Sequence, residues 1–351
     1  MRVVVVGASG NVGTSLLRAL ADEPAVDSIL GLARRIPKAD FPKTEWRRAD
    51  IARTPLRPHF DGADAVVHLA WLIQPGRDKQ RLYGVNVEGS GRVFRAAASA
   101  GVGTLVYASS VGAYAPGPKD RRVDESWPTT GLQSSFYSRH KAEVERLLDR
   151  FEEEHPDMRV VRLRPGLIFK REAASGIRRL FAGPLLPSVL VQRRLIPVVP
   201  AHPRLAFQAV HSYDVGDAYR LALVRDDARG AFNIAAEPVL DPDELGRLLG
   251  ARPLRVPARM LRAGAALSYR LRLQPSEPGW VDMGLGVPLM DVTRARSELG
   301  WSPRRSASEA LLELLEGMRA GAGLDTPPLE PGGAGPLRAR EFASGVGART
   351  G

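Results

Sequence analysis

The first twenty residues contain the feature that most constrains the fold of this chain. Val3 to Val6 is an uninterrupted β-branched run, which is typical of a strand buried on both faces of a parallel sheet. Gly7, Gly10 and Gly13 follow, and leucines then recur at helical spacing. Glycines at this spacing let the backbone approach a pyrophosphate, and the N-terminus of the next helix offers it free N–H groups. The segment predicts a dinucleotide-binding turn, with a purely structural glycine turn as the alternative.

Further apolar runs alternate with helical patterns along the chain. The predicted strands are 3–6, 28–33, 65–70, 105–110 and 158–163, followed later by 208–211 and 232–235. Long helices are expected from Phe136 to Glu154 and from Asp214 to Val224. Alternation of this kind indicates an α/β fold, a Rossmann-type doubly wound parallel sheet that binds its ligand outside the carboxyl ends of the strands.

The same pattern divides the chain into two domains and a tail. Residues 1–166 form the predicted dinucleotide-binding domain, and residues 207–235 return to its sheet. Residues 167–206 and 236–320, where the regular alternation breaks down, form a smaller and mostly helical C-terminal substrate-binding lobe. The last segment, 321–351, is rich in Gly, Pro, Ala and Arg without apolar periodicity, and we expect it to be disordered.

Composition excludes several classes of protein. The 351 residues include no cysteine, which argues against disulfides and thiolate chemistry and predicts a cytoplasmic location. No apolar run reaches the length of a membrane span and no signal peptide precedes the first strand, so no membrane partner is expected. The net charge of +11 comes from arginines scattered along the chain, with only six lysines among the 50 basic residues, so no nucleic-acid partner is expected either.

Arg34 and Arg35 follow the second predicted strand, at the position where a dinucleotide domain selects its cofactor. An acidic residue there bonds the ribose 2′-OH of NAD, whereas an arginine accommodates the 2′-phosphate of NADP. The strand ends in arginine and offers no acid, so we favour NADP and keep NAD as the alternative. A second reading of the two arginines is that both are solvated surface residues.

Tyr137 and Lys141 lie one turn apart near the start of the long predicted helix. A lysine ammonium beside a phenol favours the tyrosinate, which brings a group with an ordinary pKa of about 10 nearer to working pH as a general acid or base. Ser110, at the end of the preceding strand, would orient the substrate oxygen towards the tyrosine. The alternative is an idle helical pair, but seven tyrosines and six lysines make this spacing rare by chance.

Several short motifs recur in a fixed order along the chain. They are the glycine turn, Asp50-Ile51, His68-Leu69-Ala70, Asn86-Val87-Glu88-Gly89, Tyr107 to Ser110, Tyr137-x-x-x-Lys141, Arg164-Pro165, Val210-His211 and Asp291 to Trp301. This order resembles the extended short-chain dehydrogenases/reductases, the NAD-dependent epimerase/dehydratase family, over about residues 1–318. The resemblance implies a small-molecule substrate and a homodimer in which the helix that carries Tyr137 packs against its twin.

The motifs and the resemblance together give the predicted site. Ser110, Tyr137 and Lys141 are the predicted catalytic residues. The predicted cofactor-binding residues are Gly7, Ser9, Gly10, Asn11, Val12, Gly13, Arg34, Asp50, Ile51, Leu69, Ala70, Asn86, Ser109, Tyr137, Lys141, Pro165 and Leu167. The six histidines lack metal-ligand spacing, so no metal site is predicted. Trp280 and Trp301 are expected to pack in the core.

One departure from the family pattern bears on the substrate. Relatives that act on nucleotide sugars carry an arginine just before the Val-His landmark, where it binds the diphosphate, whereas this chain has Phe207, Gln208 and Ala209 there. Arg204, a few residues earlier, is a candidate substitute. We therefore predict an NAD(P)-dependent oxidoreductase or epimerase/dehydratase acting at a carbonyl or hydroxyl carbon of a small molecule. The alternatives are a nucleotide-sugar 4-epimerase or dehydratase with retained NAD, and a non-catalytic dinucleotide-sensing protein.

Overall fold

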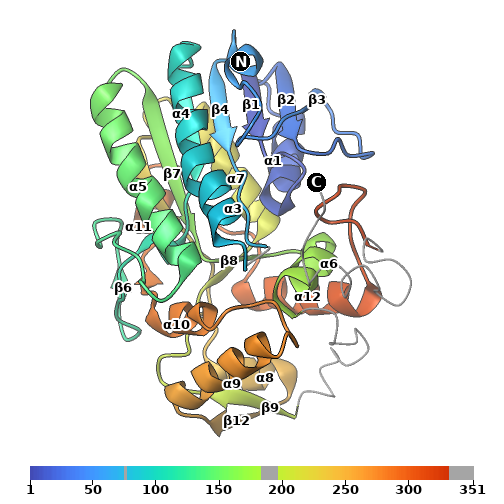
Figure 1. Ribbon diagram of the computed structural model, residues 1–351, viewed down its shortest axis with the longest axis vertical. Helices are drawn as coiled ribbons and strands as arrows, with labels where there is room; N and C mark the ends of the chain where they lie inside the picture. The colour runs from blue at the N-terminus through green and yellow to red at the C-terminus, as the bar shows by residue number, and fades with distance from the viewer. Residues whose placement is uncertain (75–76, 183–196, 332–351) are drawn as a thin grey trace.

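The computed structural model describes residues 1–74, 77–182 and 197–331. Its centre is a sheet of seven parallel strands in the order β11-β7-β5-β4-β1-β2-β3 (Figure 1). These strands are β1 (Arg2–Val6), β2 (Ser28–Ala33), β3 (Thr44–Arg48), β4 (Ala65–His68), β5 (Thr104–Ala108), β7 (Arg159–Pro165) and β11 (Gly230–Ile234). The chain leaves β1 in one direction for β2 and β3 and in the other for β4 and β5. This switch point confirms the predicted Rossmann-type fold.

Helices cover both faces of the sheet, and β1 is apolar on both of its sides. Val3 and Val5 lie in the cluster under α1 (Asn11–Ala21) and α7 (Ser212–Val224), whereas Val4 and Val6 lie in the cluster under α4 (Gly89–Ser99) and α5 (Phe136–Glu154). Alternate residues of a strand point to opposite faces, so a four-valine run serves both layers. Within the described ranges, no helix is long and apolar enough to cross a membrane.

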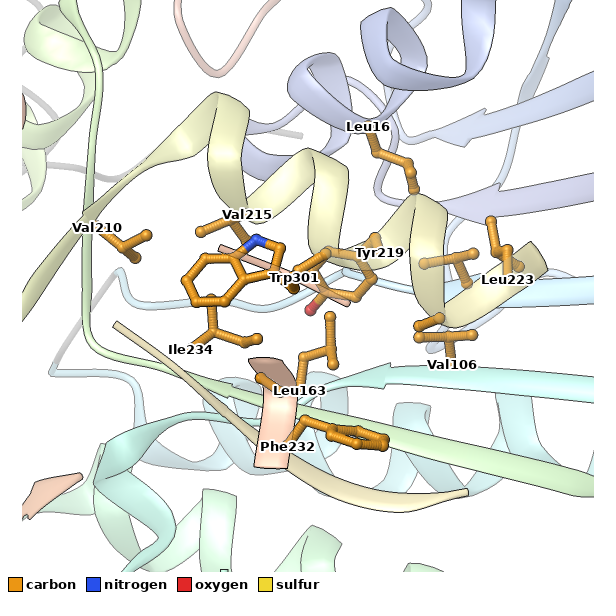
Figure 2. Close-up of a cluster of buried hydrophobic side chains, with 14 of the residues drawn as sticks. Leu16, Val106, Leu163, Val210, Val215, Tyr219, Leu223, Phe232, Ile234 and Trp301 are labelled. Carbon is orange, nitrogen blue, oxygen red and sulfur yellow. The ribbon is translucent and has the colours of Figure 1, made fainter. Parts of the chain in front are cut away.

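Figure 2 shows the core on the α7 side of the sheet, where Tyr219 and Phe232 pack near Trp301. Trp301 is 1% exposed, and its indole N–H donates to the Asp214 carbonyl at 2.8 Å. This confirms the prediction that Trp301 is a core residue. The contact also joins the C-terminal part of the chain to the sheet domain, so the two do not form independent cores.

The remaining elements build the smaller lobe and the connections between the strands of the main sheet. The helices and helical turns are α2 (Arg57–Phe60), α3 (Lys79–Tyr83), η1 (Gly84–Glu88), η2 (Val111–Ala113), η3 (Arg171–Ala173), α6 (Ala174–Ile177), η4 (Arg178–Ala182), α8 (Pro242–Leu249), α9 (Ala258–Arg270), α10 (Gly279–Gly286), α11 (Thr293–Ser297) and α12 (Ala307–Ala320). Three short parallel pairs join β8 (Leu167–Phe169) to β10 (Ala209–His211), β9 (Val198–Ala201) to β12 (Arg252–Arg255), and β6 (Arg122–Val123) to β13 (Leu289–Met290).

The return of the chain to the main sheet differs from the prediction in one respect. Of the two strands expected to return, β11 pairs with β7 at the sheet edge, but β10 pairs with β8 outside the sheet. β10 is only three residues long and follows Gln208, whose side chain bonds the backbone of Met290. The strand therefore serves to connect the sheet domain with the lobe. Residues 183–196 of the predicted lobe lie outside the described part of the chain.

Residues 321–331 pack on the rest of the chain, although they belong to the predicted disordered tail. Leu329 is buried, and the Asp325 carbonyl accepts hydrogen bonds from the backbone N–H groups of Lys38 and Ala39 (3.1 and 3.2 Å). A few backbone bonds and one buried leucine thus order a segment that has no periodicity of its own. The rest of the predicted tail lies outside the described residues.

Candidate active site

Close contacts that only glycine allows shape the turn between β1 and α1. Gly7 has a φ of 88°, and a Cβ there would lie 2.7 Å from the backbone nitrogen of Ala70. A Cβ on Gly13 would overlap the carbonyl of Ala8. The backbone N–H of Leu69 donates to the last carbonyl of β1 at 2.8 Å. The structure therefore brings three predicted cofactor residues, Gly7, Leu69 and Ala70, to one point at the end of β1 and β4.

The N-terminus of α1 fits a pyrophosphate. Its N-cap, Gly10, makes no side-chain cap, and the first turn holds no acidic residue. Within the described chain, a Cβ on Gly10 would come near only the Gly7 carbonyl, at 3.4 Å, so the space above the turn is open. The Oδ1 atom of Asn11 is buried there and has no hydrogen-bond partner among the described groups. Ser9 and Val12 flank the same turn. Free N–H groups and the positive end of the helix are what a bound anion requires.

Three predicted cofactor residues and the neighbouring Arg35 lie at the carboxyl ends of β2 and β3. Arg34 and Arg35 directly follow β2 and are exposed. Asp50 follows β3, and its Oδ1 accepts a hydrogen bond from Ala52 N (3.0 Å), which closes the turn. Ile51 is buried beside it. In Rossmann folds this edge receives the adenosine half of the dinucleotide, so the four residues are placed together where the prediction needs them.

Two other predicted cofactor residues are bonded to the protein itself. The Asn86 amide is fully buried in η1, where it accepts from Leu72 N (2.7 Å) and donates to Leu72 O (2.8 Å). The Ser109 hydroxyl donates to Glu145 Oε1. Asn86 thus fixes the loop after β4, and Ser109 fixes helix α5 against β5. Their side chains hold the walls of the site.

Pro165 and Leu167 lie beside the glycine turn at the end of β7. Pro165 is buried as the last residue of β7, and Leu167 is 39% exposed at the start of β8. The Asn11 amide donates to the Ile168 carbonyl at 3.3 Å, which connects the first turn of α1 to β8. The two predicted residues are therefore neighbours of the proposed pyrophosphate position.

Ser110 and Tyr137 meet at the carboxyl edge of the sheet. Ser110 Oγ accepts a hydrogen bond from Gly112 N (3.0 Å) and is hydrogen-bonded to the Tyr137 side chain. Tyr137 is the second residue of α5, whose N-cap is Ser135. A Cβ on Gly112 would lie 2.8 Å from the Tyr137 ring, so the close approach depends on glycine. Burial raises the pKa of Tyr137, and the bond with Ser110 partly offsets the rise.

Lys141 lies one turn further along α5 and is buried. Its Nζ donates to the Ala108 carbonyl (2.5 Å) and lies 3.6 Å from the centre of the Trp71 ring and 5.9 Å from the centre of the Tyr137 ring. Burial lowers the pKa of Lys141 from 10.5 to about 7, against a smaller opposing effect of the Glu145 carboxylate. The three predicted catalytic side chains are thus within one small region.

Two tryptophans flank Tyr137. The ring of Trp71 lies 5.8 Å from the Tyr137 ring, centre to centre, and that of Trp280 lies 5.0 Å away. The ring centre of Phe181 lies 4.9 Å from that of Trp280. Trp280 packs, as predicted, against buried apolar residues, although these form a small cluster of Leu132, Met283 and Val287 apart from the main core. Trp71 was not singled out, although its place directly after Leu69-Ala70, at the carboxyl end of β4, is a signal that could have found it.

A buried charge cluster supports the catalytic helix from behind. Arg164 makes two hydrogen bonds to the Glu145 carboxylate, both 2.9 Å, and Arg162 makes a third at 3.0 Å. Burial alone would raise the pKa of Glu145, but Arg164, then Arg162, and the Ser109 hydroxyl outweigh burial and lower it to about 2. Glu145 follows Lys141 by one turn of α5, a spacing that places it on the same helix face.

The chain belongs to the NAD dependent epimerase/dehydratase family, because the model of that family matches residues 3–235. The match confirms the resemblance found in the sequence motifs. It covers the whole glycine turn, the predicted catalytic residues and the main sheet up to β11. It ends before helices α8 to α12.

Individual relatives are distant. An uncharacterized protein of Mycobacterium tuberculosis is 28% identical over 326 residues, which are 92% of this chain and 31% of that protein. A 3 beta-hydroxysteroid dehydrogenase/Delta 5→4-isomerase of M. tuberculosis is 24% identical, over 90% of this chain and 89% of that protein. The solved UDP-glucose-4-epimerase from Stenotrophomonas maltophila, with bound NAD and formylated UDP-arabinopyranose, is 22% identical with a TM-score of 0.68, over 91% of this chain and 98% of that one. This chain therefore spans about a third of the length of the first relative, and the solved structure shares its fold.

Proposed function

We propose that this protein transfers a hydride and a proton at a carbonyl or hydroxyl carbon of a small molecule, with NAD(P) as the cofactor. One observation carries the proposal: the hydroxyls of Ser110 and Tyr137 and the ammonium of Lys141 gather beside a glycine turn that fits a dinucleotide. Membership of the epimerase/dehydratase family supports it. Net oxidation or reduction and epimerisation or dehydration all belong to the proposal, because each includes a hydride and proton transfer at such a carbon.

Each of the three side chains has a separate task. When bound, the dinucleotide accepts or supplies the hydride. Ser110 holds the substrate oxygen by a hydrogen bond, and Tyr137 removes the proton of a substrate hydroxyl or protonates a substrate carbonyl. Lys141 stabilises the tyrosinate through its positive charge, which it holds below its pKa of about 7. Trp71 and Trp280 cover the Tyr137 ring and limit the access of water.

For the substrate, we propose a compound that is bound without a diphosphate anchor. Arg204, the candidate substitute for the missing arginine, donates to the carbonyls of Leu285 (3.0 Å) and Gly117 (2.8 Å). Gln208 is bonded to the backbone of Met290. The named activity of the hydroxysteroid relative supports a less polar substrate, whereas the ligand of the similar epimerase supports a nucleotide sugar as the second candidate.

For the cofactor, we propose NADP. The exposed pair Arg34 and Arg35 at the end of β2 supports it, because a 2′-phosphate needs a cation there. The NAD in the similar epimerase supports the other choice, but that protein is only 22% identical. Titration of the purified protein with NADH and NADPH, followed by the fluorescence of the reduced cofactor, measures the preference directly.

Replacement of the proposed acid/base tests the function. In Tyr137→Phe, turnover should fall by about 10²–10⁴-fold, because the proton has no donor or acceptor. The affinity for the dinucleotide should stay within about twofold, because the phenol is not part of the pyrophosphate or adenosine site. Turnover is measured on a panel of UDP-sugars, ketones and secondary alcohols.

Tyr83→Phe is the matched control, since Tyr83 is an exposed tyrosine bonded to Glu143 on the protein surface. Unchanged turnover in Tyr137→Phe would contradict the assignment. The alternative of a non-catalytic dinucleotide sensor would gain support if the wild-type protein turned over nothing on the panel and captured a partner in only one redox state of the cofactor.

A further inference from the structure

Helix α9 presents its apolar side to solvent. Met260, Leu267 and Leu271 lie on one stripe at spacings of seven and four residues, and they are 60, 59 and 58% exposed. No residue of α9 is buried. A surface helix of a globular protein usually turns such a stripe to the core and its charges to water. In α9 the stripe faces solvent, and the arginines of the helix, Arg259, Arg262 and Arg270, are exposed as well.

Polar contacts hold α9 in this orientation. Arg262 Nε bonds both carboxylate oxygens of Asp282 on α10, at 3.0 and 3.1 Å. At the other end of the helix, the Arg77 guanidinium lies 4.1 Å from the centre of the Tyr269 ring and donates to the Tyr269 carbonyl. The half-buried Leu261, Ala265 and Tyr269 form the inner side of α9, and Met260 and Leu267 remain outside.

The surroundings of the stripe are strongly cationic. Between residues 252 and 276 the sequence has six arginines and no aspartate or glutamate. Leu254 of β12 and Leu273, which follows α9, are also exposed, at 56 and 45%. We name this surface the α9 face and define it by one list: Arg252, Leu254, Arg255, Arg259, Met260, Leu267, Arg270, Leu271, Arg272 and Leu273. In Figure 1, α9 and β12 lie at the end of the molecule farthest from the N-terminus.

We propose that the α9 face docks on the surface of an anionic lipid bilayer. Exposed leucine and methionine gain free energy by entering the interface between headgroups and acyl chains, and arginines gain it from lipid phosphates. The arginines alone would suit nucleic acid, but a phosphate backbone offers nothing to a stripe of leucines. The mixture of both on a helix that lies along the surface matches an interfacial helix.

Surface docking is compatible with the absence of a spanning helix among the described residues. The sequence-based expectation of no membrane partner rested on the lack of a spanning apolar run, on the lack of a signal peptide and on arginines that are scattered along the chain. A 13-residue helix with its apolar stripe outward lies in the plane of the interface instead. The proposal is also independent of the catalytic assignment, because none of its residues belongs to the proposed active site.

Vesicle flotation of the full chain tests the proposal. The protein should float with vesicles that contain phosphatidylglycerol and phosphatidylcholine, and at least about tenfold less with vesicles of phosphatidylcholine alone. About 1 M NaCl, where the Debye length is about 3 Å, should weaken binding to the anionic vesicles. Equal binding to both vesicles, or binding to neither, would overturn the proposal.

Variants separate the contribution of the apolar stripe from that of the arginines. The double change Leu267→Ser with Leu271→Ser should reduce anionic vesicle binding at least about tenfold, and so should Arg259→Gln with Arg270→Gln. Ile36→Ser and Arg57→Gln are the matched controls, since both residues are exposed elsewhere on the surface. Unchanged thermal unfolding shows that the variants fold, because none of the changed side chains is buried. If Leu267→Ser with Leu271→Ser instead converts a dimer to a monomer, the stripe binds a second copy of this chain and the proposal is wrong.

Discussion

Lys141 is an ammonium group in surroundings that disfavour charge. Its pKa falls from 10.5 to about 7 through burial, so the folded protein holds this proton less tightly than the unfolded chain does. Below pH 7 both states are charged and the full cost of burying the charge is present. Between pH 7 and 10.5 the folded state is neutral while the unfolded state is still charged, and stability rises with pH.

Lys141→Met should therefore abolish turnover and yet stabilise the protein. The gain in the free energy of unfolding should be a few kcal/mol at pH 6 and should shrink as the pH rises towards 10, because the wild-type lysine loses its charge. Urea unfolding at pH 6, 8 and 10 measures it. Lys38→Met, at an exposed lysine, is the control. A variant less stable than wild type at pH 6 would mean that the Trp71 ring and the Ala108 carbonyl compensate the burial.

At this scale the sequence predicts the residues that have a fixed spacing. Tyr137 and Lys141 face one side of α5 because they are four residues apart, and Gly7 is needed for a positive φ. Trp71 was not predicted. Its position over Lys141 depends on the loop after β4, which Asn86 fixes through two hydrogen bonds to the backbone of Leu72. Such a contact joins residues that no periodicity connects.

Helix α5 and strand β7 are joined by the buried Glu145 cluster. The Glu145 pKa of about 2 lies below its ordinary 4.5, so the carboxylate stabilises the fold above pH 4.5 and loses this effect as the pH falls through about 2. Glu145 forms its ion pairs with two arginines of one strand. The element that carries the catalytic residues is therefore positioned by charge as well as by apolar packing.

Glu145→Gln should destabilise the protein by about 3–5 kcal/mol at pH 7, because it leaves buried guanidinium groups without their carboxylate. The difference from wild type should decrease as the pH falls from 4.5 to 2. Urea unfolding over this range measures it. Glu153→Gln, at an exposed position of the same helix, should change stability by less than about 0.5 kcal/mol. A loss for Glu145→Gln as small as that of the control would show that the cluster does not stabilise the fold.

Strands that are apolar on both faces could be predicted from the sequence, whereas the polar edge strand β3 could not. The valine run of β1 reads as a buried strand, but Thr44–Arg48 has no apolar alternation and was not assigned as β3. This segment becomes a strand by pairing with β2. The ring of Trp46 packs over Gly31 of β2, and a Cβ on Gly31 would lie only 2.8 Å from that ring. Tertiary pairing decides such an edge, not local propensity.

For the whole molecule, we propose a homodimer, which the family resemblance implies. The outer side of α5 is exposed at Arg146 and Arg150, so this helix is accessible to a twin. Light scattering should give twice the mass of the chain. Arg146→Glu should shift the equilibrium towards monomer, because it adds negative charge beside Glu143 and Asp149 on the helix face that would meet the twin. Arg57→Glu, on the remote helix α2, is the control. A wild-type protein that is monomeric at every concentration would rule the dimer out.

The packed C-terminal segment also matters for anyone who redesigns cofactor preference. Asp325 is bonded to the backbone of Lys38 and Ala39, a few residues beyond the arginine pair at the end of β2, and Arg179 of the lobe donates to Pro328 and Glu330. Figure 1 shows this red segment rising from α12 past α6. Replacing Arg34, Arg35 and the residues that follow by the acidic loop of another enzyme would therefore also change a surface against which residues 321–331 pack. A transplanted specificity loop has to carry a matching C-terminus with it.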